Sequence, residues 1–273
     1  MAKTPITHAL ISGGASGLGN GLACRLLKRG SHVSILDLRI SNDYRQALDT
    51  AAKLGGSRWS YFEINITDAG VVQTAVNKAI TEFGAIQLAI NSAGIAVNRI
   101  LADTTVDDFQ RVININLVGS FNFAKAVLPT MEPGARFALL ASMAGFVGNY
   151  GYSAYSGSKF GVVGLAHTLR NEYEPHGIHV SCICPPEVKT PMVEAEHVSG
   201  DPVSLDLKKI AGSLESDDAC DQILKGIDQG KWIVVPGYRA KLLAFVARHL
   251  PGTFTFFGLV AVKATMKKHH RLP

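Results

Sequence analysis

Residues 8–19 read HALISGGASGLG, an apolar run that leads directly into a glycine-rich turn and then into a helical pattern. The apolar run predicts a buried strand. Gly13, Gly17 and Gly19 allow the turn to take positive φ angles and let backbone N–H groups approach a pyrophosphate at the positive end of the helix dipole. Strand, turn and helix in succession predict a dinucleotide site, whose expected cofactor-binding residues are Gly13, Ser16, Gly17, Leu18 and Gly19.

Short apolar runs alternate with helical patterns along the rest of the chain. Because these runs are continuously apolar, they predict a parallel sheet that is covered by helices on both faces. Residues 105–131 are expected to form one long helix. The predicted fold class is α/β, a doubly wound parallel seven-stranded sheet in a single domain of residues 1–236. Its strands are expected at residues 8–12, 32–36, 59–64, 86–90, 136–141, 178–184 and 232–235.

The composition is that of a folded chain with an unusual C-terminal end. Of the 273 residues, 47% are hydrophobic and 18% are charged, which excludes a disordered protein. The net charge of +5 is uneven, because residues 229–273 hold eight Lys and Arg and no Asp or Glu. The other 228 residues hold 19 basic and 22 acidic residues, a net charge of −3. The four cysteines lack metal-ligand spacing, so no metal site is expected.

Residues 237–273 form a basic and apolar C-terminal extension that is expected to be helical. Aromatic and basic residues together are typical of helices at anionic lipid surfaces, and a helix covering the pocket or a subunit interface is the open alternative. The apolar run 253–262 is about half the ~18 residues needed to span a bilayer. No signal peptide or nucleic-acid motif is evident. We therefore expect a cytoplasmic protein without a nucleic-acid partner, with peripheral membrane contact through this extension as one option.

Asp37 ends the second predicted strand, 18 residues after Gly19. An acidic side chain there accepts hydrogen bonds from the 2′-hydroxyl of a ribose and repels a 2′-phosphate, which favours NAD(H) over NADP(H). Arg39 offers a phosphate partner if Asp37 turns away. At the end of the fourth strand, the small residues of Asn91-Ser92-Ala93-Gly94 suit the close passage of backbone beside an adenosine.

Tyr155 and Lys159 are four residues apart in a helical stretch, so they share one face. An ammonium group near a phenol lowers the phenol pKa, which suits a general acid/base for interconverting an alcohol and a ketone. Ser142 ends the fifth strand, where its hydroxyl can bond the same substrate oxygen. Tyr150 and Tyr152 have no lysine four residues later.

Together, Ser12-Gly-x3-Gly-x-Gly19, Asn91-Ser-Ala-Gly94, Asn116, Ser142 and Tyr155-x3-Lys159 resemble the short-chain dehydrogenase/reductase family over roughly residues 5–236. The resemblance implies a Rossmann-like fold and a homodimer or homotetramer formed through the fourth and fifth helices. It implies that Tyr155 is the general acid/base and that Lys159 holds the ribose hydroxyls and lowers the Tyr155 pKa. Ser142 would orient the substrate oxygen, and Asn116 would hold a water that links Lys159 to solvent. The further cofactor-binding residues it implies are Asn65, Ile66, Asn91, Ala93, Gly94, Pro185, Val188 and Thr190.

The segment Pro185-Pro186-Glu187-Val188-Lys189-Thr190 departs from the family pattern, which has Gly after the first Pro. The Pro-Pro-x-x-x-Thr-Pro run is similar to the 3-ketodihydrosphingosine reductase-like branch, which acts on long-chain lipids and generally uses NADPH. Residues 191–214 would be the substrate lid. Phe146, Tyr150 and Met192 are the candidate substrate contacts.

The sequence thus predicts an NAD(H)-dependent oxidoreductase for a hydrophobic secondary alcohol or ketone. An NADPH-dependent reductase of long-chain lipid ketones is the alternative. A catalytically idle scaffold that binds a cofactor or lipid is the non-enzyme alternative, although no catalytic position of the family is missing.

Overall fold

The computed structural model describes residues 5–272, apart from the side chains of residues 210 and 211. Its centre is a sheet of seven strands in the order β3-β2-β1-β4-β5-β6-β9, and every neighbouring pair is parallel. The predicted doubly wound parallel sheet is therefore confirmed. The strands are β1 (His8–Ser12), β2 (His32–Asp37), β3 (Trp59–Glu63), β4 (Leu88–Asn91), β5 (Arg136–Leu140), β6 (His179–Ile183) and β9 (Ile233–Val234).

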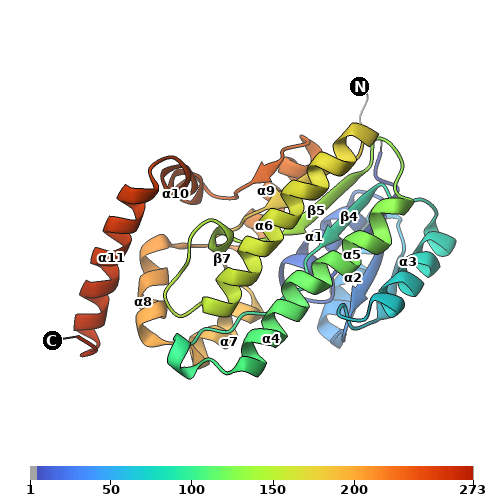
Figure 1. The fold of residues 1–273 in the computed structure, drawn as a ribbon. Coiled ribbons are helices and arrows are strands. Elements are labelled where there is room, and N and C mark those ends of the chain that lie inside the picture. Colours follow the sequence, from blue (N-terminus) through green and yellow to red (C-terminus); the bar gives the residue numbers. More distant parts are fainter. Residues whose placement is uncertain (1–4, 273) are drawn as a thin grey trace.

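Helices cover both faces of this sheet and bury two separate cores (Figure 1). One core contains apolar side chains of α3 (Ala69–Phe83), α5 (Gly119–Val127) and α6 (Ser153–Tyr173). The other contains side chains of α1 (Gly17–Lys28), α2 (Asn42–Gly55) and α9 (Ser216–Asp228). Because side chains alternate along a strand, Leu10 of β1 enters the first core, while Ala9 and Ile11 enter the second.

The single long helix predicted for residues 105–131 is wrong in one respect. The structure divides it into α4 (Val106–Ile113), a π-helical segment (Asn114–Val118), α5 and a short 3₁₀ turn (Leu128–Thr130). In the π-helical segment the side chain of Asn116 forms hydrogen bonds with the backbone of Ile95 and with the hydroxyl of Ser158. The apolar periodicity of the sequence does not reveal such a local widening, which often marks a functional site.

The lid and the C-terminal extension lie beyond the end of β6. The lid predicted for residues 191–214 consists of α7 (Pro191–Ser199), α8 (Pro202–Ala211) and β8 (Ser213–Leu214), and β8 pairs with β7 (Glu187–Val188), the short strand that precedes the lid. The extension forms α10 (Tyr238–His249) and α11 (Pro251–Lys268), and α11 lies beside α8 (Figure 1). No helix of the described chain meets, on its own, the length and hydropathy expected of a membrane span; α10 and α11 meet them only as a pair bent by 117°.

Candidate active site

A cavity of about 470 Å³ lies where the carboxyl ends of the parallel strands meet the lid. Ligands of doubly wound sheets bind at this edge, and the volume is within the usual range for small-molecule sites. Residues from both ends of the chain form its wall, including the C-terminal extension. The sequence-predicted residues on this wall are Gly13, Ser16, Gly17, Leu18, Asp37, Asn65, Ile66, Ala93, Gly94, Ser142, Tyr155, Lys159, Pro185, Val188, Thr190 and Met192.

The glycine-rich turn packs so closely against neighbouring backbone that a side chain larger than hydrogen does not fit at Gly13 or Gly19. Gly13 has φ +67°, and a Cβ there would lie 2.5 Å from the backbone nitrogen of Ala93. A Cβ on Gly19 would lie 2.0 Å from the carbonyl oxygen of Gly13. The side chain of Ser16 forms no capping hydrogen bond with α1, so it does not occupy the first N–H groups of this helix, which begins at the cavity wall. This cradle fits the pyrophosphate of a dinucleotide, with the residues of the turn holding the phosphates.

Asp37 is fixed beside the glycine-rich turn. Its carboxylate accepts hydrogen bonds from the backbone nitrogen of Ala15 at 3.0 Å and of Leu38 at 2.7 Å. Burial raises the pKa of Asp37, and these backbone donors oppose the rise by stabilising the carboxylate. The side chain of Asn65 also lines the cavity, but its amide oxygen already accepts two hydrogen bonds from Thr67.

Ser142, Tyr155 and Lys159 come together in the middle of the cavity wall. Ser142 follows β5, whereas Tyr155 and Lys159 occupy successive turns at the start of α6. The Ser142 and Tyr155 side chains form a hydrogen bond. The Lys159 Nζ donates to the carbonyl oxygen of Leu140 at 2.8 Å and lies 5.6 Å from the centre of the Tyr155 ring. A hydroxyl pair with a buried ammonium beside it is suited to moving a proton to or from a carbonyl oxygen.

The pKa shifts in this triad follow burial. Burial raises the pKa of Tyr155 to about 12, and the hydrogen bond with Ser142 opposes this rise. Burial lowers the pKa of Lys159 to about 8. The direction for Tyr155 is opposite to the one predicted from the Tyr-x-x-x-Lys spacing, because Lys159 is directed at Leu140 and desolvation of the phenol dominates.

Two predicted residues support the site from behind the wall. The Asn116 side chain accepts from the backbone nitrogen of Ile95 and donates to the Ile95 carbonyl and the Ser158 hydroxyl. Asn91 accepts from the Ser12 hydroxyl and donates to the Ser120 hydroxyl at 2.6 Å. These bonds connect β1, β4 and α6 to the long helical segment, so both asparagines hold the strand ends in register. Both Nδ2 hydrogens of Asn116 are used in these bonds and its Oδ1 accepts one of them, and its expected role with a water remains a prediction.

Phe146 and Tyr150 are not among the described residues that line the cavity. Phe146 packs against the core, and the Tyr150 hydroxyl accepts a hydrogen bond from Arg271 at 3.3 Å. Val147 and Asn149 occupy this part of the wall instead. The sequence does not reveal which side of the loop after Ser142 faces inward. Met192, the third candidate, does line the cavity.

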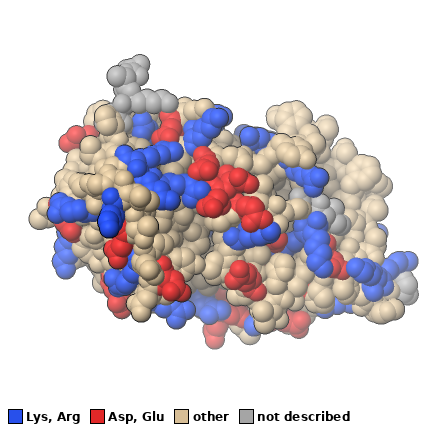
Figure 2. All heavy atoms as spheres, turned by 180° about the vertical axis from the view of Figure 1, so that it is seen from behind, with Lys and Arg blue, Asp and Glu red and all other residues tan. Residues whose placement is uncertain are grey.

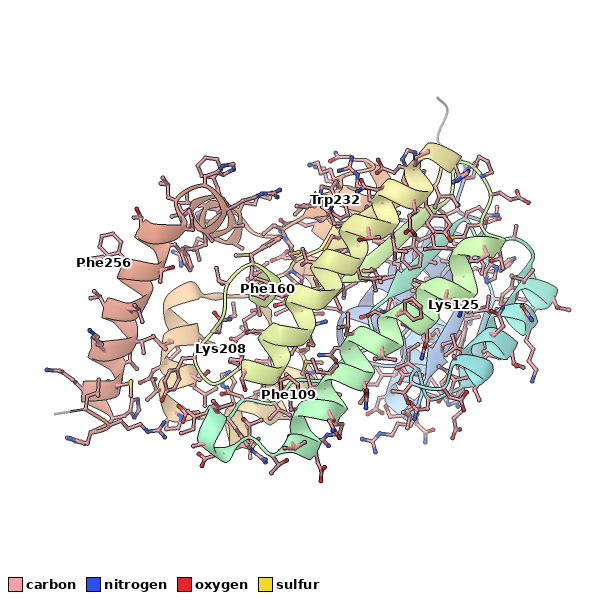
Figure 3. All side chains as sticks on the ribbon, in the orientation of Figure 1. Phe109, Lys125, Phe160, Lys208, Trp232 and Phe256 are labelled. Carbon is pink, nitrogen blue, oxygen red and sulfur yellow. The ribbon has the colours of Figure 1, made fainter. Side chains whose placement is uncertain are left out.

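The part of the cavity wall that the lid forms holds a charged cluster that the sequence does not predict. Lys208 Nζ lies 2.7 Å from Glu187 Oε2 and 2.5 Å from Glu196 Oε2. The Tyr152 hydroxyl donates to Glu196 Oε2 at 3.2 Å. Burial lowers the pKa of Lys208, but the two carboxylates outweigh this effect, so the net shift is upward. Tyr152 does have a lysine neighbour, but it comes from α8 (Figure 3), so no local spacing signals the pair.

Replacing Lys208 with Met leaves two carboxylates without a counter-charge in a largely buried place. We expect the free energy of unfolding to fall by about 3–5 kcal/mol, because removing one partner of a buried ion pair leaves the other charges uncompensated. Urea denaturation measures this loss. The control combines Lys208→Met with Glu187→Gln and Glu196→Gln and should recover most of the stability. A single variant as stable as the wild type would show that the cluster does not hold the lid.

The C-terminal extension also contributes to the wall, through Ala240 and Leu243 of α10 and Phe254 of α11. One of the two alternatives for the extension, a helix that covers the pocket, therefore has structural support. No group of three or more His, Cys, Asp or Glu side chains suited to a metal ion occurs in the part of the chain that the structure describes.

The amino-acid sequence of this chain is similar to those of known enzymes. Residues 7–199 match the family model described as short chain dehydrogenase. A 3-dehydrosphinganine reductase of Arabidopsis thaliana is 37% identical over 89% of this chain and 75% of its own length. The 3-hydroxyacyl-CoA dehydrogenase type-2 of Bos taurus is 39% identical over 68% of this chain and 74% of its own.

Solved structures are similar in fold. Levodione reductase has a TM-score of 0.77 at 25% identity, over 88% of this chain and 99% of that chain. A short-chain dehydrogenase/reductase from Burkholderia phymatum in complex with NAD has a TM-score of 0.78 at 21% identity, over 91% of this chain and 95% of that chain. The chain therefore belongs to the short-chain dehydrogenase family.

Proposed function

We propose that this oxidoreductase reduces a ketone within a long-chain, largely apolar substrate, using NADH, and catalyses the reverse oxidation of the alcohol. The observation that carries the proposal is the shared cavity, in which the Ser142–Tyr155 hydroxyl pair lies between the glycine-rich cradle and an apolar outer wall. That outer wall includes Val147, Met192, Val193, Leu243 and Phe254.

The chain's own residues handle the proton. Tyr155 is protonated at neutral pH because its pKa is about 12, so it can donate a proton to the carbonyl oxygen of the substrate. Ser142 orients that oxygen through its hydroxyl, and Lys159 provides positive charge beside the reacting atoms. The nicotinamide cofactor, when bound, supplies the hydride that the substrate carbon receives.

The relatives narrow the substrate class. Their names concern an oxygen function at carbon 3, on a sphinganine in one case and on an acyl-CoA in the other. A CoA ester carries several phosphate charges and calls for basic residues near its site. The described wall has only Lys159 and Lys208 as basic residues, and Lys208 is already paired with Glu187 and Glu196. We therefore favour a long-chain lipid ketone without phosphate.

The test compares a 3-keto sphingoid base, a 3-ketoacyl-CoA and a short-chain ketone as substrates, each with NADH and with NADPH. We expect the sphingoid ketone to have the largest kcat/KM, because its chain can contact the apolar wall while the short ketone cannot. Preference for the CoA ester would refute the argument from wall charge. No turnover of any ketone by an enzyme that binds the cofactor would favour the idle scaffold.

Asp37 carries the proposal of NADH over NADPH. Two backbone donors hold its carboxylate in place, so a 2′-phosphate would meet a fixed negative charge. Replacement by Ser removes this charge, and like-charge contact costs several kcal/mol, so the ratio of the NADPH and NADH dissociation constants should shift toward NADPH by on the order of 10²-fold. Fluorescence titration of both cofactors measures the ratio. A wild type that binds NADPH more tightly would contradict the proposal and support the NADPH-dependent alternative.

We also propose a homodimer through α4, α5 and α6. Three phenylalanines on these helices are between 43% and 50% exposed: Phe109, Phe121 and Phe160. Figure 3 shows Phe109 on α4 and Phe160 on α6. Exposed aromatic groups of this size mark interfaces. Sedimentation velocity should give a dimer for the wild type and a monomer for Phe121→Asp. The matched control is Phe257→Asp in α11, which should remain dimeric.

A further inference from the structure

The outer side of the C-terminal extension exposes an apolar ridge. On α10 and α11 this ridge includes Phe256 and Phe257, which are 64% and 65% exposed, and the Phe256 ring points away from the rest of the molecule (Figure 3). Water-exposed aromatic and aliphatic residues grouped in this way indicate a binding surface. The other exposed members of the ridge are Tyr238, Leu242, Phe245, Leu250, Leu259 and Val260.

Basic residues border this ridge, and the extension has no acidic residue to offset them. Some of the basic residues are used internally, because Lys268 and His269 bind Asp206 and Arg271 binds Asp201 in the lid. Lys263 and Lys267 form no ion pair within the described residues, so their charge is free for a partner. In Figure 2 the C-terminal helices lie at the right, where uncharged surface is bordered by Lys and Arg.

The internal ion pairs hold the far end of α11 against the lid. Thr265 is buried there, while the first half of α11 is mostly exposed. The same two helices turn Ala240, Leu243 and Phe254 toward the cavity. One surface of the extension therefore faces solvent, and the other faces the cavity. An apolar ligand bound at the ridge is separated from the cavity wall only by these two helices.

From this arrangement we propose that α10 and α11 dock the enzyme on the surface of an anionic lipid bilayer. The exposed ridge enters the interface between headgroups and acyl chains, and Lys263 and Lys267 bind the anionic headgroups. The docked helices bring the apolar side of the cavity next to the bilayer. The second step, delivery of a lipid from the bilayer to the cavity, rests on the proposed function, whereas docking itself does not.

Flotation of the full chain with vesicles tests the docking. We expect strong binding to phosphatidylcholine vesicles that contain about one-third phosphatidylglycerol, and weak binding to phosphatidylcholine alone. Raising NaCl to about 1 M, where the screening length is about 3 Å, should release most of the protein. Lys263→Gln with Lys267→Gln should weaken binding about 25-fold, at about fivefold for each lysine. Phe256→Ser with Phe257→Ser should weaken it by at least about tenfold.

Matched controls remove the same groups elsewhere on the surface. Lys53→Gln with Lys78→Gln removes two exposed charges, and Leu54→Ser with Val71→Ser removes two exposed apolar side chains. Both controls should float like the wild type. Equal flotation of the tail variants and the wild type would overturn the proposal. So would a dimer that dissociates on Phe256→Ser with Phe257→Ser, because the ridge would then be covered by a second copy of the chain.

An activity readout separates this proposal from the proposed function. The variants of the extension, Lys263→Gln with Lys267→Gln and Phe256→Ser with Phe257→Ser, should reduce a soluble short-chain ketone at the rate of the wild type. They should lose activity on a long-chain ketone presented in anionic vesicles. If docking is lost while the vesicle-borne ketone is still reduced at the wild-type rate, delivery through the extension is wrong. If vesicles are bound but no ketone is reduced, the proposed function fails and docking stands.

Discussion

Tyr155→Phe should lower kcat for ketone reduction by about 10²–10⁴-fold, the range that a positioned general acid contributes. The substitution removes only the hydroxyl that forms the hydrogen bond with Ser142, and the ring can still fill the same buried space. Cofactor affinity should therefore change far less than kcat. Steady-state kinetics and cofactor titration on the same preparation measure both quantities.

The matched control is Tyr150→Phe, which removes a phenolic hydroxyl outside the cavity wall. It should keep the wild-type kcat, because the Tyr150 hydroxyl contacts Arg271 and not the reacting groups. A Tyr155→Phe variant with wild-type kcat would show that another group delivers the proton, and Tyr152, whose ring centre is 5.8 Å from that of Tyr155, would be the next candidate.

Lys159→Met should make the protein more stable and less active. The folded chain lowers the Lys159 pKa from 10.5 to about 8, so at neutral pH it holds a charged group that burial disfavours. The difference corresponds to about 3 kcal/mol of the free energy of unfolding. Loss of the hydrogen bond to Leu140 offsets about 1 kcal/mol of the gain. The net gain of about 2 kcal/mol should raise Tm by roughly 4–8 °C.

The stability difference between Lys159→Met and the wild type depends on pH. Between pH 8 and 10.5 the unfolded wild type binds more protons at this site than the folded one, so wild-type stability rises with pH there. The advantage of Lys159→Met is therefore complete below pH 8 and fades as pH rises toward 10.5. Activity should fall by roughly 10–100-fold, the worth of a hydrogen bond to a charged group. A Lys159→Met variant less stable than the wild type at pH 7 would show that burial of the Lys159 ammonium does not destabilise the folded protein.

The sequence predicted the architecture because its signals are local. Continuous apolar strands and the spacing of Gly13, Gly17 and Gly19 follow from neighbouring residues, and the sheet and cradle agree with them. The pairing of Tyr155 with Lys159 also depends only on one helical turn. Each of these features is decided by residues within a few positions of each other.

The features that escaped prediction depend on contacts between distant segments. Glu187, Glu196 and Lys208 meet because two lid helices fold over the cavity, and no spacing announces them. Within the π-helical segment, the side chain of Asn116 bonds to Ile95 and Ser158, which are distant from it in the sequence. The upward pKa shift of Tyr155 depends on burial by the whole surrounding structure, which outweighs the local effect expected from Lys159.

The most direct test of the proposed reaction follows the absorbance of reduced nicotinamide and the product together, with NADH and a 3-keto sphingoid base in anionic vesicles. We expect one hydroxylated product for each NADH consumed, with almost no turnover by Tyr155→Phe. Binding of NADH without its consumption, for this ketone and for shorter ones, would contradict the claim that the cavity is a working oxidoreductase site.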